Sequence, residues 1–502
     1  MRLAAGFAVA AALACGGGAP PVERPPNVIV ILADDLGYND ISLHGNRLWS
    51  TPNIDRIGRE GVRFTRGHTT HATCSPSRAA LMTGRYQQRF GYEFTVGANN
   101  LVPGFDGTLG PRDPRTVITP EANDPVRLEI QGVPPEEITL AELVGPAYRS
   151  AMLGKWHLGV GPRFSPSSQG FDEWIGFGAA LYGAVDDPEV IAARLPWDGI
   201  DNVLWSRLRT TVQRNGEDVE PGKYLTDFLT DEAVRFIDES GDEPFLLYLS
   251  YFAPHTPLQA PKDVYDRLDH IAMERQRVYA AMIESMDEGV GRVLDKLDEE
   301  GLAENTLVFF TSDNGGAPYV NIPHLNDPFR GWKGTFYQGG VVVPYLLRWP
   351  ERVPAGLVRE APVSTLDVFP TVAEATGAQP PGDRAYDGES LLPLVDDPSA
   401  HGERTLLWRA GDYKAVQKGD WKLHVDGTQG KRWLSHLAED PGEHGDLSGA
   451  HPERLDELLG FLEEMEASFV EPLWPTPFYV PFVIDKDEDG TPVGDDYVLF
   501  PG

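Results

Sequence analysis

Three long apolar runs stand out in the first two thirds of the chain, and polar residues follow each of them. The runs cover residues 27–33, 244–252 and 306–312, and they are rich in Val, Ile, Leu and Phe. Short, uninterrupted apolar runs of this kind are typical of strands buried on both faces of a parallel sheet. The polar residues that follow them are Asp34-Asp35, His255 and Asp313-Asn314. Because the carboxyl ends of parallel strands share one edge, where open α/β folds bind ligands, we expect these side chains to lie together.

The segments between these runs carry the spacing of amphipathic helices. Apolar residues recur every three or four positions from Val278 to Leu297, which predicts a long helix that ends near Gly301. Residues 224–240 predict another such helix, which leads into the second run. We therefore predict an α/β fold over residues 25–377, with a large, mainly parallel sheet sandwiched by helices.

Two long stretches, residues 95–135 and 182–221, have no sustained period and are rich in Gly, Pro, Asp and Arg. Long irregular loops in compact domains are often functional, so one interpretation makes these stretches the walls of a substrate pocket. The other interpretation, which the sequence leaves equally open, is that they are insertions without a role.

The pattern changes beyond the α/β region. Residues 405–408, 413–417 and 421–425 predict short strands separated by Gly-Asp turns, and residues 452–465 predict a helix packed on them. We therefore assign residues 378–502 to a small C-terminal subdomain, with an antiparallel sheet of the four-stranded type, a helix and an acidic tail.

The acidic tail has a partial resemblance to a calcium loop. Asp485, Asp487 and Asp489 have the opening spacing of such a loop, and Asp496 stands at the position of its last ligand. The usual glutamate is missing there, and no helix is predicted on either side. We therefore favour a solvated acidic tail over a second calcium site.

Length and charge narrow the classes of function. The chain has 502 residues, 41% of them hydrophobic, which is enough for one large domain and a smaller one. It holds 43 Lys and Arg against 76 Asp and Glu, so its formal charge of −33 argues against binding of nucleic acid. An anionic substrate therefore needs a local concentration of positive charge. The residues that we place in such a pocket are Arg78, Lys155, His157, His255 and Lys333.

The first 24 residues are typical of an export leader. An apolar stretch follows Met1-Arg2 and ends at Cys15, and it is too short to span a membrane as a mature helix. Leu13-Ala14-Cys15 resembles the end of a bacterial lipoprotein signal, in which the cysteine is lipidated. We therefore expect a periplasmic or cell-surface lipoprotein attached through Cys15, or otherwise a secreted protein. The one other cysteine, Cys74, is then left without a disulfide partner.

The stretch around that cysteine carries a resemblance to a known family. Ala72-Thr73-Cys74-Ser75-Pro76-Ser77-Arg78-Ala79-Ala80-Leu81-Met82-Thr83-Gly84 resembles, at every position, the signature of type I sulfatases of the alkaline phosphatase superfamily. Other motifs similar to those of sulfatases occur in the family's order. They are Asp34-Asp35, Gly154-Lys155-Trp156-His157-Leu158-Gly159, Pro254-His255-Thr256-Pro257, Asp313-Asn314-Gly315-Gly316 and Lys333-Gly334-Thr335. The arylsulfatase-like resemblance implies hydrolysis of sulfate esters to an alcohol and inorganic sulfate.

The resemblance also implies a chemical change at Cys74. In these sulfatases a formylglycine-generating enzyme oxidises the motif cysteine to formylglycine, whose hydrate attacks the sulfur of the bound ester. Arg78 would favour the ionised form of this nucleophile. Taken alone, the residue has a simpler interpretation, because most buried free cysteines are inert packing residues.

Further roles are implied for the basic residues of the motifs. Lys155, His255 and Lys333 would neutralise charge on the transferring sulfuryl group, and His255 or Lys333 would protonate the departing alcohol. His157 would then remove a proton from the remaining hydroxyl group, so that sulfate leaves. Any one of these residues in isolation would be interpreted as a packing, turn or surface residue.

A metal site can be argued from the residues themselves. Asp34, Asp35, Asp313 and Asn314 offer only oxygen ligands, which suit a hard cation such as Ca²⁺ or Mg²⁺ and suit zinc poorly. The resemblance favours Ca²⁺ and adds the modified Cys74 as a ligand. A single acidic pair would be interpreted as a helix cap or a turn, but two pairs at two strand ends favour a shared metal.

Two positions depart from the family's pattern. Gln338 stands where glutamate is usual, and Val342 stands where arginine is usual. The second signature is also loose, with Ala147 in place of glycine. The absent arginine puts the support around Lys333 in question, although the implied catalytic set is complete.

Two other functions stay open at this point. One is a phosphonate monoester or phosphodiester hydrolase of the same superfamily, which shares the fold and the metal. The other is a non-catalytic surface lipoprotein that binds sulfated glycans. For a sulfatase, we expect a sulfated carbohydrate as the substrate, with an aryl sulfate as the alternative.

Overall fold

The computed structural model describes residues 24–502 except residues 179 and 488. The predicted leader, residues 1–24, lies outside the described residues apart from Arg24, and so does its candidate lipidation site, Cys15. Within the described part, every helix is too short or too polar to cross a bilayer.

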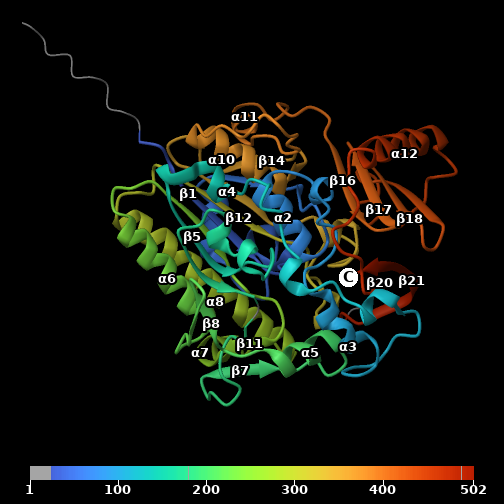
Figure 1. Ribbon diagram of the computed structural model, residues 1–502, viewed down its shortest axis with the longest axis horizontal. Coiled ribbons are helices and arrows are strands. Elements are labelled where there is room, and N and C mark those ends of the chain that lie inside the picture. The colour runs from blue at the N-terminus through green and yellow to red at the C-terminus, as the bar shows by residue number, and fades with distance from the viewer. Residues whose placement is uncertain (1–23, 179, 488) are drawn as a thin grey trace, which may run out of the picture.

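A ten-stranded sheet runs through the larger part of the molecule (Figure 1). Its strands, in spatial order, are β14 (Leu357–Arg359), β2 (Val62–Phe64), β13 (Tyr345–Arg348), β12 (Thr306–Ser312), β1 (Asn27–Ala33), β10 (Phe245–Ser250), β5 (Arg149–Lys155), β6 (Glu173–Phe177), β8 (Val212–Arg214) and β9 (Glu217–Val219). The strands from β12 to β6 are parallel, and antiparallel strands adjoin them on both sides. The predicted, mainly parallel sheet is confirmed.

The three apolar runs of the sequence form neighbouring strands at the centre of this sheet. In the register, Ile29 of β1 lies between Leu247 of β10 and Val308 of β12. All seven residues of β1 are buried. The carboxyl ends of these strands therefore share one edge, as the sequence predicted.

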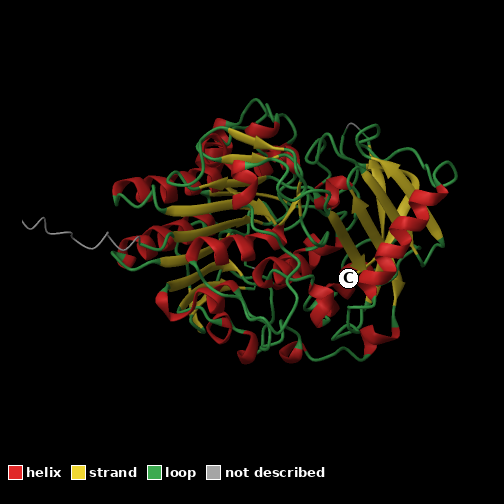
Figure 2. Ribbon diagram, turned by 90° about the horizontal axis from the view of Figure 1, so that it is seen from above, coloured by secondary structure: helices red, strands yellow, loops and turns green. Residues whose placement is uncertain are grey.

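Helices cover both faces of the sheet (Figure 2). Ile29 and Ile31 of β1 face one apolar core, whereas Val28 and Val30 face the other. The helices of the first face include α1 (Pro52–Arg59), α6 (Leu225–Ser240) and α8 (Glu274–Glu299), and those of the second include α2 (Cys74–Thr83), α4 (Leu140–Val144) and α10 (Val368–Thr376). Both predicted helices, α6 and α8, are present, and α8 ends two residues before Gly301.

A separate antiparallel sheet follows near the C-terminus, as predicted. Its strands are β16 (Thr405–Ala410), β17 (Tyr413–Lys418), β18 (Trp421–Asp426) and β19 (Lys431–His436). Helix α12 (Pro452–Glu466) packs on it through Leu458 and Leu462, which join Val416 and Leu423 in one apolar cluster. This sheet and helix form the smaller part of the molecule in Figure 2.

The acidic tail is an ordered hairpin rather than a calcium loop. Strands β20 (Phe478–Lys486) and β21 (Pro492–Pro501) pair with each other, and β20 also pairs with β4 (Val117–Ile118). Arg330 donates hydrogen bonds to both Asp485 and Asp496. The Asp487 carboxylate accepts N–H groups of its own turn. Three of the four carboxylates that resembled calcium ligands, those of Asp485, Asp487 and Asp496, therefore already have protein partners.

Candidate active site

The predicted site residues come together at the carboxyl edge of the large sheet. Asp34 and Asp35 follow β1, Lys155 ends β5 with His157 two residues later, His255 lies in the turn after β10, and Asp313 and Asn314 follow β12. Cys74 and Arg78 lie at the start of α2, and Lys333 lies in the irregular segment before α9 (Gln338–Val341). Buried parallel strands thus deliver the acids, and loops and one helix terminus deliver most of the bases.

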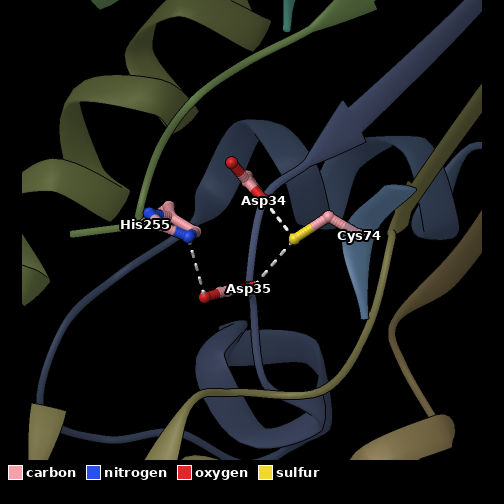
Figure 3. Close-up of side chains that lie close together, drawn as sticks. All are labelled: Asp34, Asp35, Cys74 and His255. Atoms are coloured by element: carbon pink, nitrogen blue, oxygen red, sulfur yellow. Dashed lines mark hydrogen bonds and ion pairs between the residues drawn. The ribbon is translucent and has the colours of Figure 1, made fainter. Parts of the chain in front are cut away.

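Cys74 lies between two carboxylates at the centre of the site (Figure 3). Its Sγ atom lies 3.4 Å from Oδ1 of Asp34 and 3.7 Å from Oδ1 of Asp35. Burial, together with the negative charge of Asp313, raises the pKa of the Cys74 thiol well above its usual range. The encoded thiol is therefore protonated at neutral pH and is a poor nucleophile.

Two lysines neutralise these carboxylates. Nζ of Lys155 lies 2.6 Å from Oδ2 of Asp34, and Nζ of Lys333 lies 2.7 and 2.8 Å from the two oxygens of Asp35. Although burial opposes it, the ammonium group of Lys333 holds the pKa of Asp35 well below its usual range. Each of these buried acids is thus paired with an ammonium group.

Arg78 is fully buried and holds Asp313 in place. Its Nε and one terminal nitrogen each lie 2.8 Å from Oδ2 of Asp313, and another of its N–H groups donates to the Lys155 carbonyl. The other Asp313 oxygen accepts the backbone N–H of Asp35. Arg78 therefore links three of the strand ends that carry the site.

The oxygen donors at this edge fit a hard cation, whereas the encoded thiol of Cys74 and the imidazole of His255 suit softer metals. Asp34, Asp35, Cys74 and His255 each offer one ligand atom, and these atoms lie within 4.8 Å of one another. Oδ1 of Asn314 is buried next to them, and it has no hydrogen-bond partner. An orphaned buried oxygen beside two carboxylates is what a site for Ca²⁺ or Mg²⁺ requires. Asp313 is not among these four residues, and its carboxylate contacts Arg78 and the backbone of Asp35.

The two histidines of the site are half-buried and uncharged at neutral pH. Nε2 of His255 lies 3.6 Å from Oδ2 of Asp35, and burial lowers the pKa of His255 to about 3. Burial also lowers the pKa of His157 well below its usual range, and Nδ1 of this residue has no hydrogen-bond partner. A neutral imidazole with a free nitrogen is able to accept a proton.

Tyr319 belongs to the site, although no sequence pattern pointed to it. Its hydroxyl donates to Oδ2 of Asp35 at 2.5 Å and lies 3.3 Å from Nζ of Lys333 and 3.4 Å from Nε2 of His255. The residue lies on a short 3-10 turn (Pro318–Val320) inside an irregular segment. A lone tyrosine there gave no periodic signal.

The two departures from the family's pattern are accommodated by other contacts. The backbone N–H of Gln338 donates to Glu443 of the C-terminal sheet region at 2.7 Å, and its side chain donates to Gln417. Val342 is buried and bridges to His68. The segment that carries Lys333 is thus supported by C-terminal residues.

A cavity of about 300 Å³ opens beside Cys74. Lys155, His157, His255 and Lys333 line its catalytic end together with Tyr319. Its walls include Val96, Leu101 and Leu128 from the first irregular stretch, Ile200 and Leu204 from the second, and Phe478, Val480, Phe482 and Phe500 from the hairpin. The prediction that the irregular stretches form pocket walls is confirmed, whereas the wall formed by the hairpin was not predicted.

The chain is similar in sequence to known proteins over most of its length. The family model "Sulfatase" matches residues 26–378. Steryl-sulfatase of Mus musculus is 34% identical over 453 residues, covering 78% of this chain and 68% of its own length. N-acetylgalactosamine-6-sulfatase of Homo sapiens is 32% identical over 497 residues, covering 91% of this chain and 88% of its own length.

Solved structures show the same architecture. The crystal structure of Ps i-CgsB in complex with k-i-k-neocarrahexaose superposes with a TM-score of 0.76 at 30% identity, covering 90% of this chain and 95% of that chain. Phosphonate monoester hydrolase of Agrobacterium radiobacter superposes with a TM-score of 0.59 at 20% identity, covering 88% of this chain and 95% of that chain. This second likeness is one of fold alone.

Proposed function

Because the chain belongs to the sulfatase family, whose members hydrolyse sulfate esters, we propose that it does so through a formylglycine formed from Cys74. The observation that carries the proposal is the position of Sγ of Cys74, 3.4 Å from both Asp34 and Lys333. A nucleophile at this point lies against anionic metal ligands on one side and an ammonium group on the other. Formylglycine supplies there, as its hydrate, the hydroxyl nucleophile that the protonated thiol lacks.

The surrounding residues take the remaining roles. Lys155 and Lys333 bind the sulfate oxygens and neutralise the charge that develops on them. Lys333, which stays protonated, or His255, after it has taken up a proton, donates a proton to the alcohol as it leaves, since both line the cavity beside Cys74. His157, with its free Nδ1, accepts the proton of the remaining hydroxyl group on residue 74, so that sulfate leaves and the aldehyde returns. Arg78 holds Asp313 and orders the strand ends.

We propose Ca²⁺ as the resident cation, with Mg²⁺ as the second choice. Asp34, Asp35 and Asn314 would hold it, together with the modified residue 74, and Asp313 would join if its contact with Arg78 were shared. When bound, the cation supplies positive charge that lowers the pKa of a coordinated hydroxyl group and polarises the sulfate. Lys155 and Lys333 would then be released from the carboxylates and become available to the substrate.

The substrate class has support of two kinds. The carbohydrate interpretation is supported by Ps i-CgsB, whose structure holds a neocarrahexaose, and by relatives named N-acetylgalactosamine-6-sulfatase. The aryl sulfate alternative is supported by the apolar cavity beside Cys74 and by a relative named arylsulfatase H. Both classes share the reaction proposed here.

Sulfate and phosphate release tests the proposed reaction. Protein co-produced with a formylglycine-generating enzyme would be assayed with 4-nitrophenyl sulfate, a panel of sulfated sugars, 4-nitrophenyl phenylphosphonate and bis(4-nitrophenyl) phosphate. We expect higher kcat/KM for a sulfate ester than for either phosphorus ester. Preference for a phosphorus ester would favour the hydrolase alternative, and sulfated glycan binding without turnover would favour the binding protein.

Export is also a proposal. The leader and Cys15 predict a lipid-attached protein. Labelling with a radioactive fatty acid should mark the wild-type chain and not Cys15→Ser, whereas label on neither chain would favour plain secretion.

A further inference from the structure

The cavity beside Cys74 has its titratable side chains at one end, and apolar side chains make up most of the remaining lining. Its titratable lining residues are Cys74, Lys155, His157, His255, Tyr319 and Lys333, and all of them face the catalytic end. Beyond them, the polar side chains among the described lining residues are those of Thr73, Thr95 and Asn100. The described lining holds no Asp, Glu, Arg or Gln side chain. The pocket thus offers charge to a sulfate group and little hydrogen bonding to the rest of a substrate.

The apolar wall is built by segments far apart in the sequence. Ala98, Phe478 and Val480 form a buried cluster against which Leu101 and Phe105 pack, and the Phe105 and Phe478 ring centroids lie 4.7 Å apart. Helix α5 (Gly199–Arg207) adds Ile200 and Leu204 to the lining. The residues of the hairpin and of the first irregular stretch are thus packed against each other, so that this part of the wall is preformed.

The hairpin of this wall is also fixed to the catalytic segment. Gly334 follows Lys333 with a φ of +84°, and a Cβ atom on it would lie 2.3 Å from the ring of Phe482. The ring of Phe482 therefore packs directly on the backbone beside the lysine that contacts Cys74. The apolar wall and the sulfate end are parts of one continuous cavity.

We infer that the alcohol released by this enzyme is apolar and carries one ring, or two fused rings, next to the ester oxygen. This inference rests on the proposed function. A pocket of about 150 Å³ lined by Leu, Ile and Phe holds a benzene ring, so a cavity of about 300 Å³ has room for two rings. A sugar ring carries several hydroxyl groups, and burying them without hydrogen-bond partners costs free energy. This lining has few polar side chains that could serve as such partners. The occupant is therefore the apolar part of an aryl sulfate rather than a sugar.

Kinetics with one apolar and one sugar sulfate test the inference. The substrates would be 1-naphthyl sulfate and N-acetylgalactosamine 6-sulfate, and the variants Leu101→Ser and Leu204→Ser, which change half-buried positions on two different walls. Leu208→Ser, half-buried just past the end of α5 and outside the lining, is the matched control. We expect each wall variant to raise KM for 1-naphthyl sulfate about ten-fold with little change in kcat, and the control to leave both unchanged.

Binding to inactive Cys74→Ala protein separates this inference from the proposed reaction. With Ca²⁺ present, calorimetry should give a Kd for 1-naphthyl sulfate at least about ten-fold lower than that for inorganic sulfate, and the wall variants should remove this difference. Absence of sulfate release from every ester, with formylglycine confirmed by peptide mass, would overturn the reaction but leave this binding test valid. Higher kcat/KM for the sugar sulfate, or equal Kd values for 1-naphthyl sulfate and inorganic sulfate, would overturn the inference.

Discussion

Nζ of Lys333 lies 3.4 Å from Sγ of Cys74, and the same nitrogen bonds both oxygens of Asp35. One ammonium group therefore faces both the candidate nucleophile and a candidate metal ligand. Although burial opposes it, the charge of Asp35 raises the pKa of Lys333, so that this group stays protonated. Few positions in the site join the two parts of the proposed chemistry so directly.

Replacing this lysine should impair catalysis much more than folding. We expect Lys333→Met to lower kcat for 4-nitrophenyl sulfate roughly 10²- to 10³-fold, since a buried positive group at the reacting centre is lost. Lys486→Met, on the hairpin and over the ring of Trp332, is the control and should retain most of the activity. Equal effects of the two substitutions would argue that Lys333 is only structural.

Removal of the metal should reduce activity and stability together. Asp34, Asp35 and Asn314 would be left without their shared cation, so we expect a chelator to abolish sulfate release and to lower Tm. Calcium added in excess should restore both, and magnesium should restore them less well. Metal analysis would first show that the treated enzyme is metal-free. If its Tm and kcat were then the same as before treatment, the proposed site would be excluded.

A buried ionic network in the C-terminal region should contribute strongly to stability. Glu443 is fully buried, 2.8 Å from Nε2 of His424 and 3.4 Å from Nζ of Lys422. Glu443→Gln leaves the buried lysine without its counter-charge, so we expect the free energy of unfolding to fall by roughly 3 kcal/mol in urea titrations. Glu457→Gln removes an exposed pair with Lys418, and it should cost less than about 1 kcal/mol.

Stability should fall on mild acidification because of buried histidines outside the site. Burial lowers the pKa of His68 and of His71 to about 3, whereas an unfolded chain protonates histidine near pH 6.5. Between these values the unfolded state binds more protons, so the free energy of unfolding should fall as pH falls below about 6.5. The slope of the free energy of unfolding against pH should approach about 1.4 kcal/mol per pH unit for each histidine.

Urea titrations of two variants between pH 7 and pH 5 test this sign. His68→Gln should reduce the slope, whereas His270→Gln, at an exposed position, should leave it unchanged. A slope unaffected by His68→Gln would contradict the assignment.

The part of the fold that holds the acids could be predicted from the sequence because its signal is local. Uninterrupted apolar runs fixed β1, β10 and β12, and the polar residues after them had to meet at one edge of a parallel sheet. The motif around Cys74 placed the candidate nucleophile by resemblance. The assignment of individual site residues to metal binding or catalysis stays a prediction.

The pocket wall could not be predicted as readily, because its parts meet only in three dimensions. Residues 478–484 form a continuous apolar run, Phe-Tyr-Val-Pro-Phe-Val-Ile, which is typical of a strand. Such a run predicts a strand, but it does not predict which surface the strand covers. Tyr319 is a different case, since a single residue in an irregular segment has no period to detect.

The most direct test of the account is the chemical state of residue 74 measured together with its activity. Peptide mass spectrometry of protein co-produced with a formylglycine-generating enzyme should show conversion of Cys74 to formylglycine, and sulfate release should rise in proportion to the converted fraction. Cys74→Ala should fold with an unchanged circular dichroism spectrum and release no sulfate. Full sulfatase activity in Cys74→Ala, or in protein whose Cys74 is wholly unmodified, would contradict the account.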